Sequence, residues 1–271
     1  MLIDKTLVNK NSNPYIISEI GLNHNGDFNE AINLINDSKA AKCDAIKFQI
    51  RSESFFEGDI KKMEIGQQYV YEYVKNTYLN YIEYAKLFRY ARELDLDVIV
   101  SCWDIESLLF AKEEGIKTLK IASADLTNHL LIERSLELFE NIIMSTGMST
   151  QEEIESSIKN ILKKCKNLCL LHCSSTYPAP VNTLNLNFIE RLKKSYPELL
   201  IGYSGHEIEY HVCLVAQAKG ATIFEKHITR NKSFKGNDHK VSLLKDEMHN
   251  LVNMLNDGFK SLGNEKDRVI Q

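Results

Sequence analysis

The sequence predicts a (β/α)8 TIM barrel that forms one catalytic domain over residues 1–271, and three observations lead to this fold class. The chain has 271 residues, a usual length for one α/β barrel. Short apolar runs alternate eight times with longer amphipathic segments, and this order is typical of a parallel barrel. No internal repeat, low-complexity tract or Pro/Gly-rich linker separates a second domain.

The apolar runs are short and rich in Ile, Leu and Val, which predicts buried parallel strands. The expected strands are Tyr15–Glu19, Ala45–Gln49, Val98–Ser101, Thr118–Ile121, Ile142–Ser145, Leu168–His172, Leu200–Tyr203 and Thr222–Lys226. The segments between them have the apolar spacing of helices that cover a sheet on one side. The expected helices are Phe28–Lys42, Tyr81–Leu94, Ile105–Glu114, Leu130–Leu138, Gln151–Lys163, Phe188–Ser195, Tyr210–Lys219 and Lys245–Leu262.

Several of these helices have recognisable ends. Asp27 and Thr150 precede two of them, and their side chains can accept hydrogen bonds from the first turn. Gly115 and Gly220 follow two others, where a left-handed residue often ends a helix.

One segment, Arg51–Asn80, interrupts the alternation between the second strand and its helix. It is rich in charge and Tyr, and connections of this length are usually functional or disordered. It leaves the carboxyl end of a strand, where barrel active sites form. We therefore interpret it as a substrate-covering segment.

Composition excludes several classes of partner. Charged residues make up 26% of the chain and the formal net charge is −4, which argues against nucleic acid or an anionic membrane as a main partner. No run approaches the roughly 20 apolar residues that span a bilayer. The start, Met1–Asn13, lacks the apolar core of a signal peptide. We expect a cytoplasmic protein that binds anions through locally placed side chains.

The six cysteines are scattered along the chain. Cys165, Cys169 and Cys173 have an i, i+4, i+8 spacing that could indicate a metal site, but the last two lie in an apolar strand pattern. We interpret all six as reduced core residues, which agrees with a cytoplasmic location.

Polar residues recur where the expected strands end. In a barrel these positions converge on one face, and burying such groups there costs free energy unless they are paired or functional. The residues are Glu19, Lys47, Gln49, Ser101, Lys120, Ser123, Ser145, Thr146, His172, Ser174, Ser175, Tyr177, Ser204, His206, Glu225 and His227.

Two histidines, His206 and His227, lie at the ends of neighbouring strands. With carboxylates nearby they suit an N/O site for Mn2+ or Mg2+. No third His or Cys has the spacing of a tetrahedral zinc site. The alternative is that each is a hydrogen-bonded core residue.

Two lysines, Lys47 and Lys120, point the same way from separate strands. With the hydroxyls of Ser123, Ser145 and Ser204 they suit a ligand that carries a phosphate and a carboxylate. Alternatives are simple ion pairs at strand ends, or a Schiff-base lysine.

Glu19, Asp125 and Glu225 are candidate catalytic residues, since carboxylates at such positions can move protons or orient metal ligands. Each could instead only cap the next helix.

At these residues the chain resembles the sialic acid synthase family, the phosphoenolpyruvate-dependent nonulosonic acid synthases. The match runs from Tyr15 to Leu243 in the family's order. The matching segments are ISEIGLNHNGDFNEAINLI, CDAIKFQ, LKIASADLTN, IIMSTGMST, LLHCSSTYPAP, IGYSGHE, ATIFEKHIT and GNDHKVSL.

The resemblance implies a role for most of these residues. His206 and His227 would bind Mn2+ or Mg2+. Phosphoenolpyruvate would be held by Lys47, Lys120, Ser123, Ser145, Ser175 and Ser204. The sugar would contact Gln49, Tyr177 and Asp238.

The chain departs from the family at several positions. Ser175 stands where some members have Asn, and Cys102–Trp103 replaces a common Thr-Pro pair, so an anion contact made by that Thr is in doubt. Asp125, and the Gly-His-Glu order in YSGHE, are similar to the animal-type branch. Members usually continue into a small antifreeze-like domain that supplies an Arg near the sugar's N-acyl group in a partner subunit. The sequence given ends at Gln271, just after the eighth barrel helix, so we expect the sugar side to be open, or closed by a homodimer partner or a separate chain, or the chain to be a fragment.

The resemblance implies condensation of phosphoenolpyruvate with an N-acetylmannosamine-type amino sugar, giving a sialic-acid-type nonulosonic acid and phosphate. The metal would polarise the sugar aldehyde, and C3 of phosphoenolpyruvate would attack it. Two alternatives stay open: a Schiff-base keto-acid aldolase, and a sugar- or phosphoenolpyruvate-binding barrel without turnover. The sequence does not decide between N-acetylmannosamine, its 6-phosphate and 2,4-diacetamido sugars.

Overall fold

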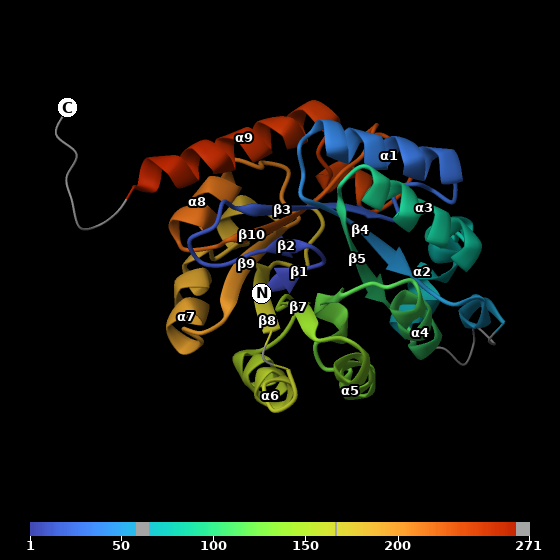
Figure 1. Cartoon of the computed structure of the whole chain (residues 1–271), viewed down its shortest axis with the longest axis horizontal. Helices are drawn as coiled ribbons and strands as arrows, with labels where there is room; N and C mark the ends of the chain where they lie inside the picture. Colours follow the sequence, from blue (N-terminus) through green and yellow to red (C-terminus); the bar gives the residue numbers. More distant parts are fainter. Residues whose placement is uncertain (58–64, 166, 264–271) are drawn as a thin grey trace.

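Eight parallel strands close into a barrel in this computed structural model, which describes residues 1–57, 65–165 and 167–263. The order around the barrel is β10-β3-β4-β5-β6-β7-β8-β9, so each strand pairs with its neighbour in the chain and the last with the first. The predicted (β/α)8 fold is therefore confirmed (Figure 1). The strands are β3 Tyr15–Gly21, β4 Ala45–Ile50, β5 Asp97–Cys102, β6 Thr118–Ile121, β7 Asn141–Ser145, β8 Asn167–Cys173, β9 Leu200–Gly205 and β10 Ile223–His227.

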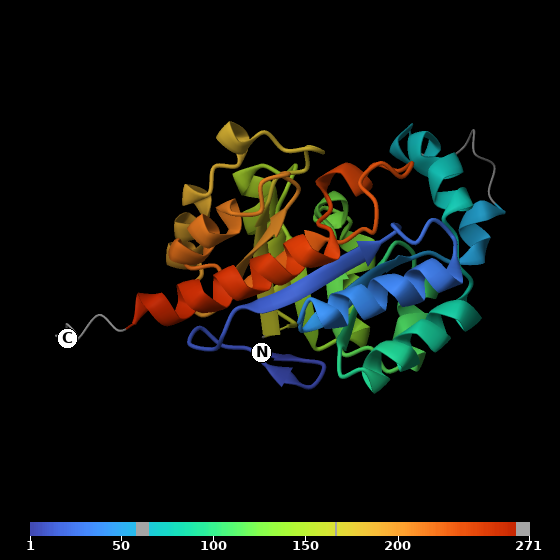
Figure 2. The same ribbon diagram turned by 90° about the horizontal axis from the view of Figure 1, so that it is seen from above.

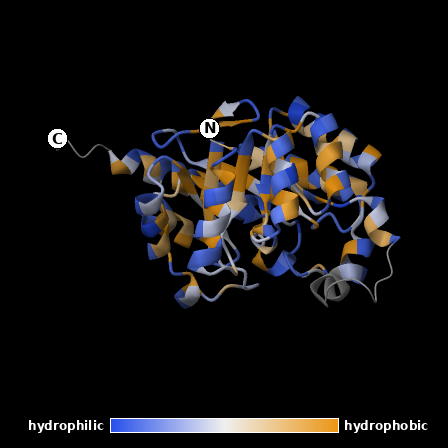
Figure 3. Cartoon of the chain, turned by 90° about the horizontal axis from the view of Figure 1, so that it is seen from below, coloured by the Kyte–Doolittle hydropathy of each residue, from blue (hydrophilic) through white to orange (hydrophobic). Residues whose placement is uncertain are grey.

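Helices surround the barrel on its outer side (Figure 1). The long helix α9 packs against both α1 and α8 (Figure 2). Figure 3 shows helices that carry both hydrophilic and hydrophobic residues, as expected when one face covers a sheet. The helices are α1 Phe28–Ala40, α2 Ile65–Asn76, α3 Tyr81–Glu93, α4 Ile105–Glu113, α5 His129–Leu138, α6 Gln151–Ile161, α7 Asn187–Ser195, α8 Val212–Ala218 and α9 Lys245–Leu262.

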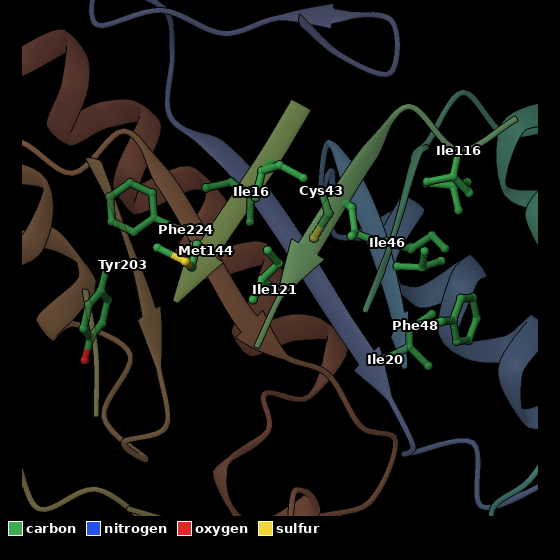
Figure 4. Close-up of a cluster of buried hydrophobic side chains, with 14 of the residues drawn as sticks. Ile16, Ile20, Cys43, Ile46, Phe48, Ile116, Ile121, Met144, Tyr203 and Phe224 are labelled. Carbon is green, nitrogen blue, oxygen red and sulfur yellow. The ribbon is translucent and has the colours of Figure 1, made fainter. Parts of the chain in front are cut away.

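Side chains alternate along each strand and separate two regions of core. Ile16, Ile46 and Phe48 point outward and pack with the helices (Figure 4). The inward positions nearest the amino ends of the strands, such as Ile17 and Ile143, form a second apolar cluster inside the barrel. This cluster fills the half of the barrel nearest the amino ends of the strands. Polar inward residues are therefore left only at the carboxyl ends.

A short hairpin covers the amino end of the barrel. Strands β1 Leu2–Ile3 and β2 Thr6–Leu7 pair in antiparallel fashion, and Ile3 and Val8 pack into the inner apolar cluster. The sequence did not predict this hairpin, because a strand of two residues shows no alternation.

The predicted helix ends are confirmed. Asp27 Oδ1 accepts hydrogen bonds from the backbone N–H groups of Asn29 and Glu30, at 2.7 and 3.2 Å. Thr150 and Glu153 form a reciprocal capping box. Gly115 and Gly220 have φ values of +72° and +104°, which favour glycine.

The segment Arg51–Asn80 differs from a simple loop. It contains a 3-10 helix, Glu53–Phe56, and helix α2, neither of which the sequence predicted, because the whole segment was interpreted as one long connection. Residues 58–64 of this segment lie outside the described residues, as does Gln271.

Two further expectations concern membrane-spanning segments and the cysteines. No helix among the described residues is long and apolar enough to cross a membrane. All six cysteines are buried and free, as expected of core residues, and their reduced state stays a prediction. Cys169 lies in the inner apolar cluster, and Cys165 in the outer one.

Candidate active site

Two connected cavities lie at the carboxyl ends of the strands. The inner cavity has a volume of about 220 Å3 and the outer cavity about 1090 Å3, and Gln49, Trp103, Ala124 and Tyr177 line both. Asp125 and Asp238 line the outer cavity. Every other predicted site residue lines the inner cavity: Glu19, Lys47, Gln49, Lys120, Ser123, Ser145, Ser175, Tyr177, Ser204, His206, Glu225 and His227. The structure thus brings together all fourteen predicted site residues, whereas the strand-end residues Thr146, His172 and Ser174 line neither cavity.

Lys47 sits between two carboxylates at the base of the inner cavity. Its Nζ lies 2.9 Å from Glu19 Oε1 and 3.8 Å from Glu225 Oε1, and all three side chains are buried. It also donates to Ser101 Oγ at 3.3 Å. Burial lowers the pKa of Lys47, but the two carboxylates outweigh this effect and raise the pKa above its ordinary value. Lys47 is therefore held as an ammonium ion in one position.

Lys120 is buried without a carboxylate in direct contact. Its Nζ donates to Ser145 Oγ at 2.7 Å and to the Ile121 carbonyl at 2.9 Å. Burial lowers its pKa, and Glu225 only partly offsets this effect. An anion in the inner cavity would supply the negative charge that Lys120 lacks.

The hydroxyl groups of the four predicted serines, Ser123, Ser145, Ser175 and Ser204, also line the inner cavity. Gly147 lets two of them approach, because a Cβ there would lie 2.4 Å from Ser175 Oγ and 2.9 Å from Ser123 Oγ. The Gly147 backbone N–H donates to Ser123 Oγ at 3.1 Å. Ser145 bonds to Lys120, as above. Together these hydroxyl groups can donate hydrogen bonds to an anion that lies beside the ammonium groups of Lys47 and Lys120.

The pKa values of the two buried carboxylates, Glu19 and Glu225, shift in opposite directions. Burial raises the pKa of Glu19, more than Lys47 lowers it. Burial also acts on Glu225, but Lys120 and Lys47 outweigh it and lower its pKa. Ser204 Oγ donates to Glu225 Oε1 at 3.1 Å, and Gln49 Nε2 donates to Glu19 Oε1 at 2.8 Å. Glu19 is thus the carboxyl better suited to carry a proton.

The two imidazoles face each other with ring centroids 5.6 Å apart. His206 Nδ1 lies 2.7 Å from the Ser174 carbonyl, so that nitrogen carries the proton and donates. His206 Nε2 then accepts from the Tyr177 hydroxyl at 2.8 Å. Burial, followed by the neighbouring His227, lowers the pKa of His206 to about 3, and burial also lowers the pKa of His227. Both rings are neutral at physiological pH.

This donor set fits a divalent ion that takes two nitrogens from the protein. A ring that donates Nδ1–H to a carbonyl presents Nε2 as metal ligands commonly do. The buried oxygens Glu19 Oε2 and Glu225 Oε2 have no hydrogen-bond partner. In the part of the chain that the structure describes, no group of three or more His, Cys, Asp or Glu could hold a metal. Water and substrate oxygens would have to complete the coordination.

A buried ion pair supports the two histidines from outside the barrel. Lys226 Nζ donates to Glu207 Oε1 at 3.0 Å and to the Glu207 carbonyl at 2.9 Å, and both side chains are fully buried. Tyr203 donates its hydroxyl to Glu207 Oε2 at 2.7 Å. Glu207 follows His206 and Lys226 precedes His227, so the pair fixes their separation. The sequence did not predict this ion pair, although a Lys inside an apolar strand was a signal.

The outer cavity has a different lining. Asp125 Oδ1 accepts from Asn128 Nδ2 at 3.0 Å, and burial raises the pKa of Asp125. Asp238 Oδ2 lies 3.9 Å from His227 Nδ1, and burial raises its pKa as well. Arg51, the first residue of the segment Arg51–Asn80, was not predicted as a site residue, yet it lines this cavity.

Other residues of the long segment and of the strand ends also line the outer cavity. Phe55, Tyr73 and Val74, from the described parts of Arg51–Asn80, face it. Trp103 lines both cavities, whereas Cys102 Sγ lies 3.4 Å from the Ser107 carbonyl, away from them. Trp103, not Cys102, therefore contributes to the site.

Comparisons with known proteins agree with this architecture. The NeuB family model matches residues 34–267. N,N'-diacetyllegionaminic acid synthase of Campylobacter jejuni is 33% identical, over 92% of this chain and 77% of its own length. Human N-acetylneuraminate-9-phosphate synthase is 31% identical, over 94% of this chain and 73% of its own length.

A solved structure is also similar. The crystal structure of N-acetylneuraminic acid (sialic acid) synthetase from Leptospira borgpetersenii, in complex with citrate, superposes with a TM-score of 0.88. It is 33% identical and covers 96% of this chain and 88% of that one. The family match and these identities, over nearly the whole chain, show that this protein belongs to the NeuB family.

Proposed function

We propose that the protein condenses phosphoenolpyruvate with an N-acetylmannosamine-type amino sugar, giving a sialic-acid-type nonulosonic acid and phosphate. The observation that carries this proposal is the composition of the inner cavity, where two ammonium groups, five serines and two neutral imidazoles line the same space. The related synthases named above support the same chemistry.

The inner cavity suits phosphoenolpyruvate because that ligand carries two anionic groups. Lys47 and Lys120 bind them, and Ser123, Ser145, Ser175 and Ser204 orient them. Lys47 is already held by Glu19 and Glu225, so its ammonium group needs no rearrangement when the anion arrives. The vinyl carbon then faces the space between this wall and the histidines.

His206 and His227 would hold Mn2+ or Mg2+, which when bound would polarise the sugar aldehyde. Gln49 and Tyr177 line the passage between the cavities and orient the open-chain sugar, with Asp238 beyond them. A bond forms between C3 of phosphoenolpyruvate and the aldehyde carbon, water adds at C2, and phosphate leaves as its C–O bond breaks. Glu19, whose pKa is raised by burial, accepts or donates a proton, with Glu225 and Asp125 as further candidates.

Several finer expectations belong to this proposal. Small-molecule substrates follow from the synthase relatives. A homodimer or separate antifreeze-like chain that closes the outer cavity, the assignment of residues 1–271 to one catalytic domain, and a cytoplasmic location stay predictions.

Phosphate release tests the proposal. The protein is incubated with phosphoenolpyruvate, Mn2+ and, in turn, N-acetylmannosamine, its 6-phosphate and a 2,4-diacetamido sugar. We expect sugar-dependent phosphate release, and an 18O label in the bridging position should leave with the phosphate. Binding of phosphoenolpyruvate without release for any sugar would contradict a catalytic role.

The Schiff-base alternative is tested in parallel with borohydride and pyruvate. Burial lowers the pKa of Lys120, so that lysine is the stronger candidate for imine formation, whereas the pKa of Lys47 is raised. We expect no covalent adduct on either lysine. Trapping at Lys120 would favour the aldolase.

A further inference from the structure

The turn that follows β3 places a buried amide, the side chain of Asn23, against two chain segments near β10. Asn23 is 1% exposed, and its Nδ2 donates to the Ile228 carbonyl at 2.7 Å and to Ser242 Oγ at 2.8 Å. A carbonyl only accepts, so the amide nitrogen must face Ile228. Ile228 is the residue after His227, and Ser242 lies just before α9. One amide group therefore connects three parts of the chain.

Ser242 extends this connection to Asp238. The Ser242 hydroxyl accepts from Asn23, so its own proton can donate, and it donates to the Asp238 carbonyl at 2.7 Å. Ser242 is also 1% exposed. Hydrogen bonds between such buried groups are stronger than they would be in water. The Asn23–Ser242 link thus holds the backbone of Asp238 at a fixed place relative to β10.

A backbone bridge holds only a later part of the same segment. The Leu243 N–H donates to the His227 carbonyl at 2.8 Å, which joins Leu243 to β10. Asp238 lies earlier in the chain, on the far side of a 3-10 helix that separates it from this bridge. The Ser242 hydroxyl reaches back across that helix to Asp238. The position of Asp238 therefore depends on side chains as well as on the backbone bridge.

Asp238 lies where its charge can act on His227. Asp238 Oδ2 is 3.9 Å from His227 Nδ1, a distance at which the carboxylate attracts an N–H group although no hydrogen bond forms. His227 Nδ1 is buried and has no hydrogen-bond partner among residues 1–57, 65–165 and 167–263. The Asp238 charge therefore favours a proton on Nδ1, which leaves Nε2 with a free lone pair.

We infer that Asn23 is a positioning residue of the active site, which acts through Ser242 to hold the Asp238 carboxylate beside His227 and so sets the tautomer of that histidine. The inference rests on the proposed function, in which His227 offers a nitrogen to a divalent ion. A histidine that binds a metal commonly turns its other ring nitrogen to a carboxylate. Asp238, which the sequence predicted as a sugar contact, thus also orients a metal-binding histidine.

The tautomer of His227 is the most direct readout of this role. A long-range 1H–15N spectrum of protein labelled with 15N-histidine distinguishes the two tautomers, and His227→Gln assigns the signals. We expect the proton on Nδ1 in wild type. Asn23→Ala and Asp238→Ala should each increase the fraction that carries the proton on Nε2, because the carboxylate is displaced or removed. The spectrum requires neither metal nor turnover.

Two serine variants separate positioning from general stability. Ser242→Ala keeps the bond between Asn23 and Ile228 but breaks the link to Asp238, so it should change the His227 signals as Asn23→Ala does. It carries the test if Asn23→Ala does not fold. The matched control is Ser38→Ala in α1: Ser38 is fully buried, donates to the Leu34 carbonyl at 2.7 Å and lies 2.7 Å from Ser18 Oγ. It should lower stability in urea and leave the His227 signals unchanged.

Mn2+ affinity tests whether the link acts through Asp238. In calorimetric titrations, Ser242→Ala and Asp238→Ala should each weaken Mn2+ binding about 10-fold, as expected for the outer partner of a metal-binding histidine. The double variant should bind Mn2+ no more weakly than Asp238→Ala alone.

Additive losses in the double variant, or wild-type His227 signals in Ser242→Ala, would overturn the inference. If wild type binds no Mn2+ while the His227 signals change as expected, the metal of the proposed function is rejected and the positioning role is supported.

Discussion

The inner and outer cavities differ in how their buried charged groups are paired. In the inner cavity Lys47 is paired with Glu19 and Glu225 before any ligand arrives. In the outer cavity, Arg51 Nη1 and Trp103 Nε1 are buried and have no hydrogen-bond partner among the described residues. The inner cavity is thus arranged around an internal charge network, so changes there should affect stability and all substrates. Changes at Arg51 or Trp103 should affect only the choice of sugar.

Replacing Lys47 with Met should have the largest effect. It leaves Glu19 and Glu225 close together with no ammonium group between them, so that of the two ammonium groups only Lys120 still acts on Glu225, and breaking a buried pair of this kind costs about 3–5 kcal/mol. We expect a lower free energy of unfolding in urea and loss of phosphoenolpyruvate use. Adding Glu19→Gln should restore part of the stability but not the activity. If Lys47→Met alone were as stable as wild type, the charge network would not contribute to the stability of the fold.

Breaking the buried ion pair between Lys226 and Glu207 should have the second largest effect. Lys226→Met leaves Glu207 buried and unpaired, again at about 3 kcal/mol. Since the pair sets the separation of His206 and His227, Mn2+ affinity measured by calorimetry should fall about 10-fold. The double variant Lys226→Met with Glu207→Gln should regain stability but not metal affinity. If metal affinity is unchanged in both, the pair has only a structural role.

Lys120→Met separates ligand binding from stability. Its Nζ contacts only a hydroxyl and a carbonyl, so no carboxylate loses its direct partner. We expect stability at or above that of wild type, and a loss of about 1.5–3 kcal/mol in kcat/KM for phosphoenolpyruvate. Lys117→Met, an exposed lysine just before β6, serves as the control. Unchanged kinetics in Lys120→Met would remove this lysine from the anion site.

Ser175→Ala should have the smallest effect. Its hydroxyl is neutral and contributes about 1 kcal/mol at most to holding an anion. The KM for phosphoenolpyruvate should rise a few-fold, and the preference among sugars should stay the same. A change in sugar preference instead would mean that the two cavities are not independent.

Much of the inner cavity could be predicted because inward residues recur at every second position of a strand. Glu225 and His227 of β10 follow this rule, as do Lys47 and Gln49 of β4. The pairing of Lys47 with Glu19 could not be predicted, because strand neighbours depend on the register of β3 against β4, which a single sequence does not state.

The outer cavity was harder to predict, because its residues come from segments outside the strands. Arg51 and Trp103 lie beyond the strands, where alternation no longer fixes direction, and their contact arises from two segments far apart in the chain. Helix α2 was missed because its sequence is dominated by Tyr and polar residues. The ends of the strands therefore predict the residues of the inner cavity better than those of the outer cavity.

The most direct test of the central claim is calorimetric titration of phosphoenolpyruvate in the presence of Mn2+. Wild type and Arg51→Met should bind it with similar affinity, because Arg51 belongs to the outer cavity. The double variant Lys47→Met with Lys120→Met should bind it at least about 100-fold more weakly, since both charge-assisted contacts are lost. Unchanged binding in the double variant, together with weakened binding in Arg51→Met, would contradict the assignment of phosphoenolpyruvate to the inner cavity.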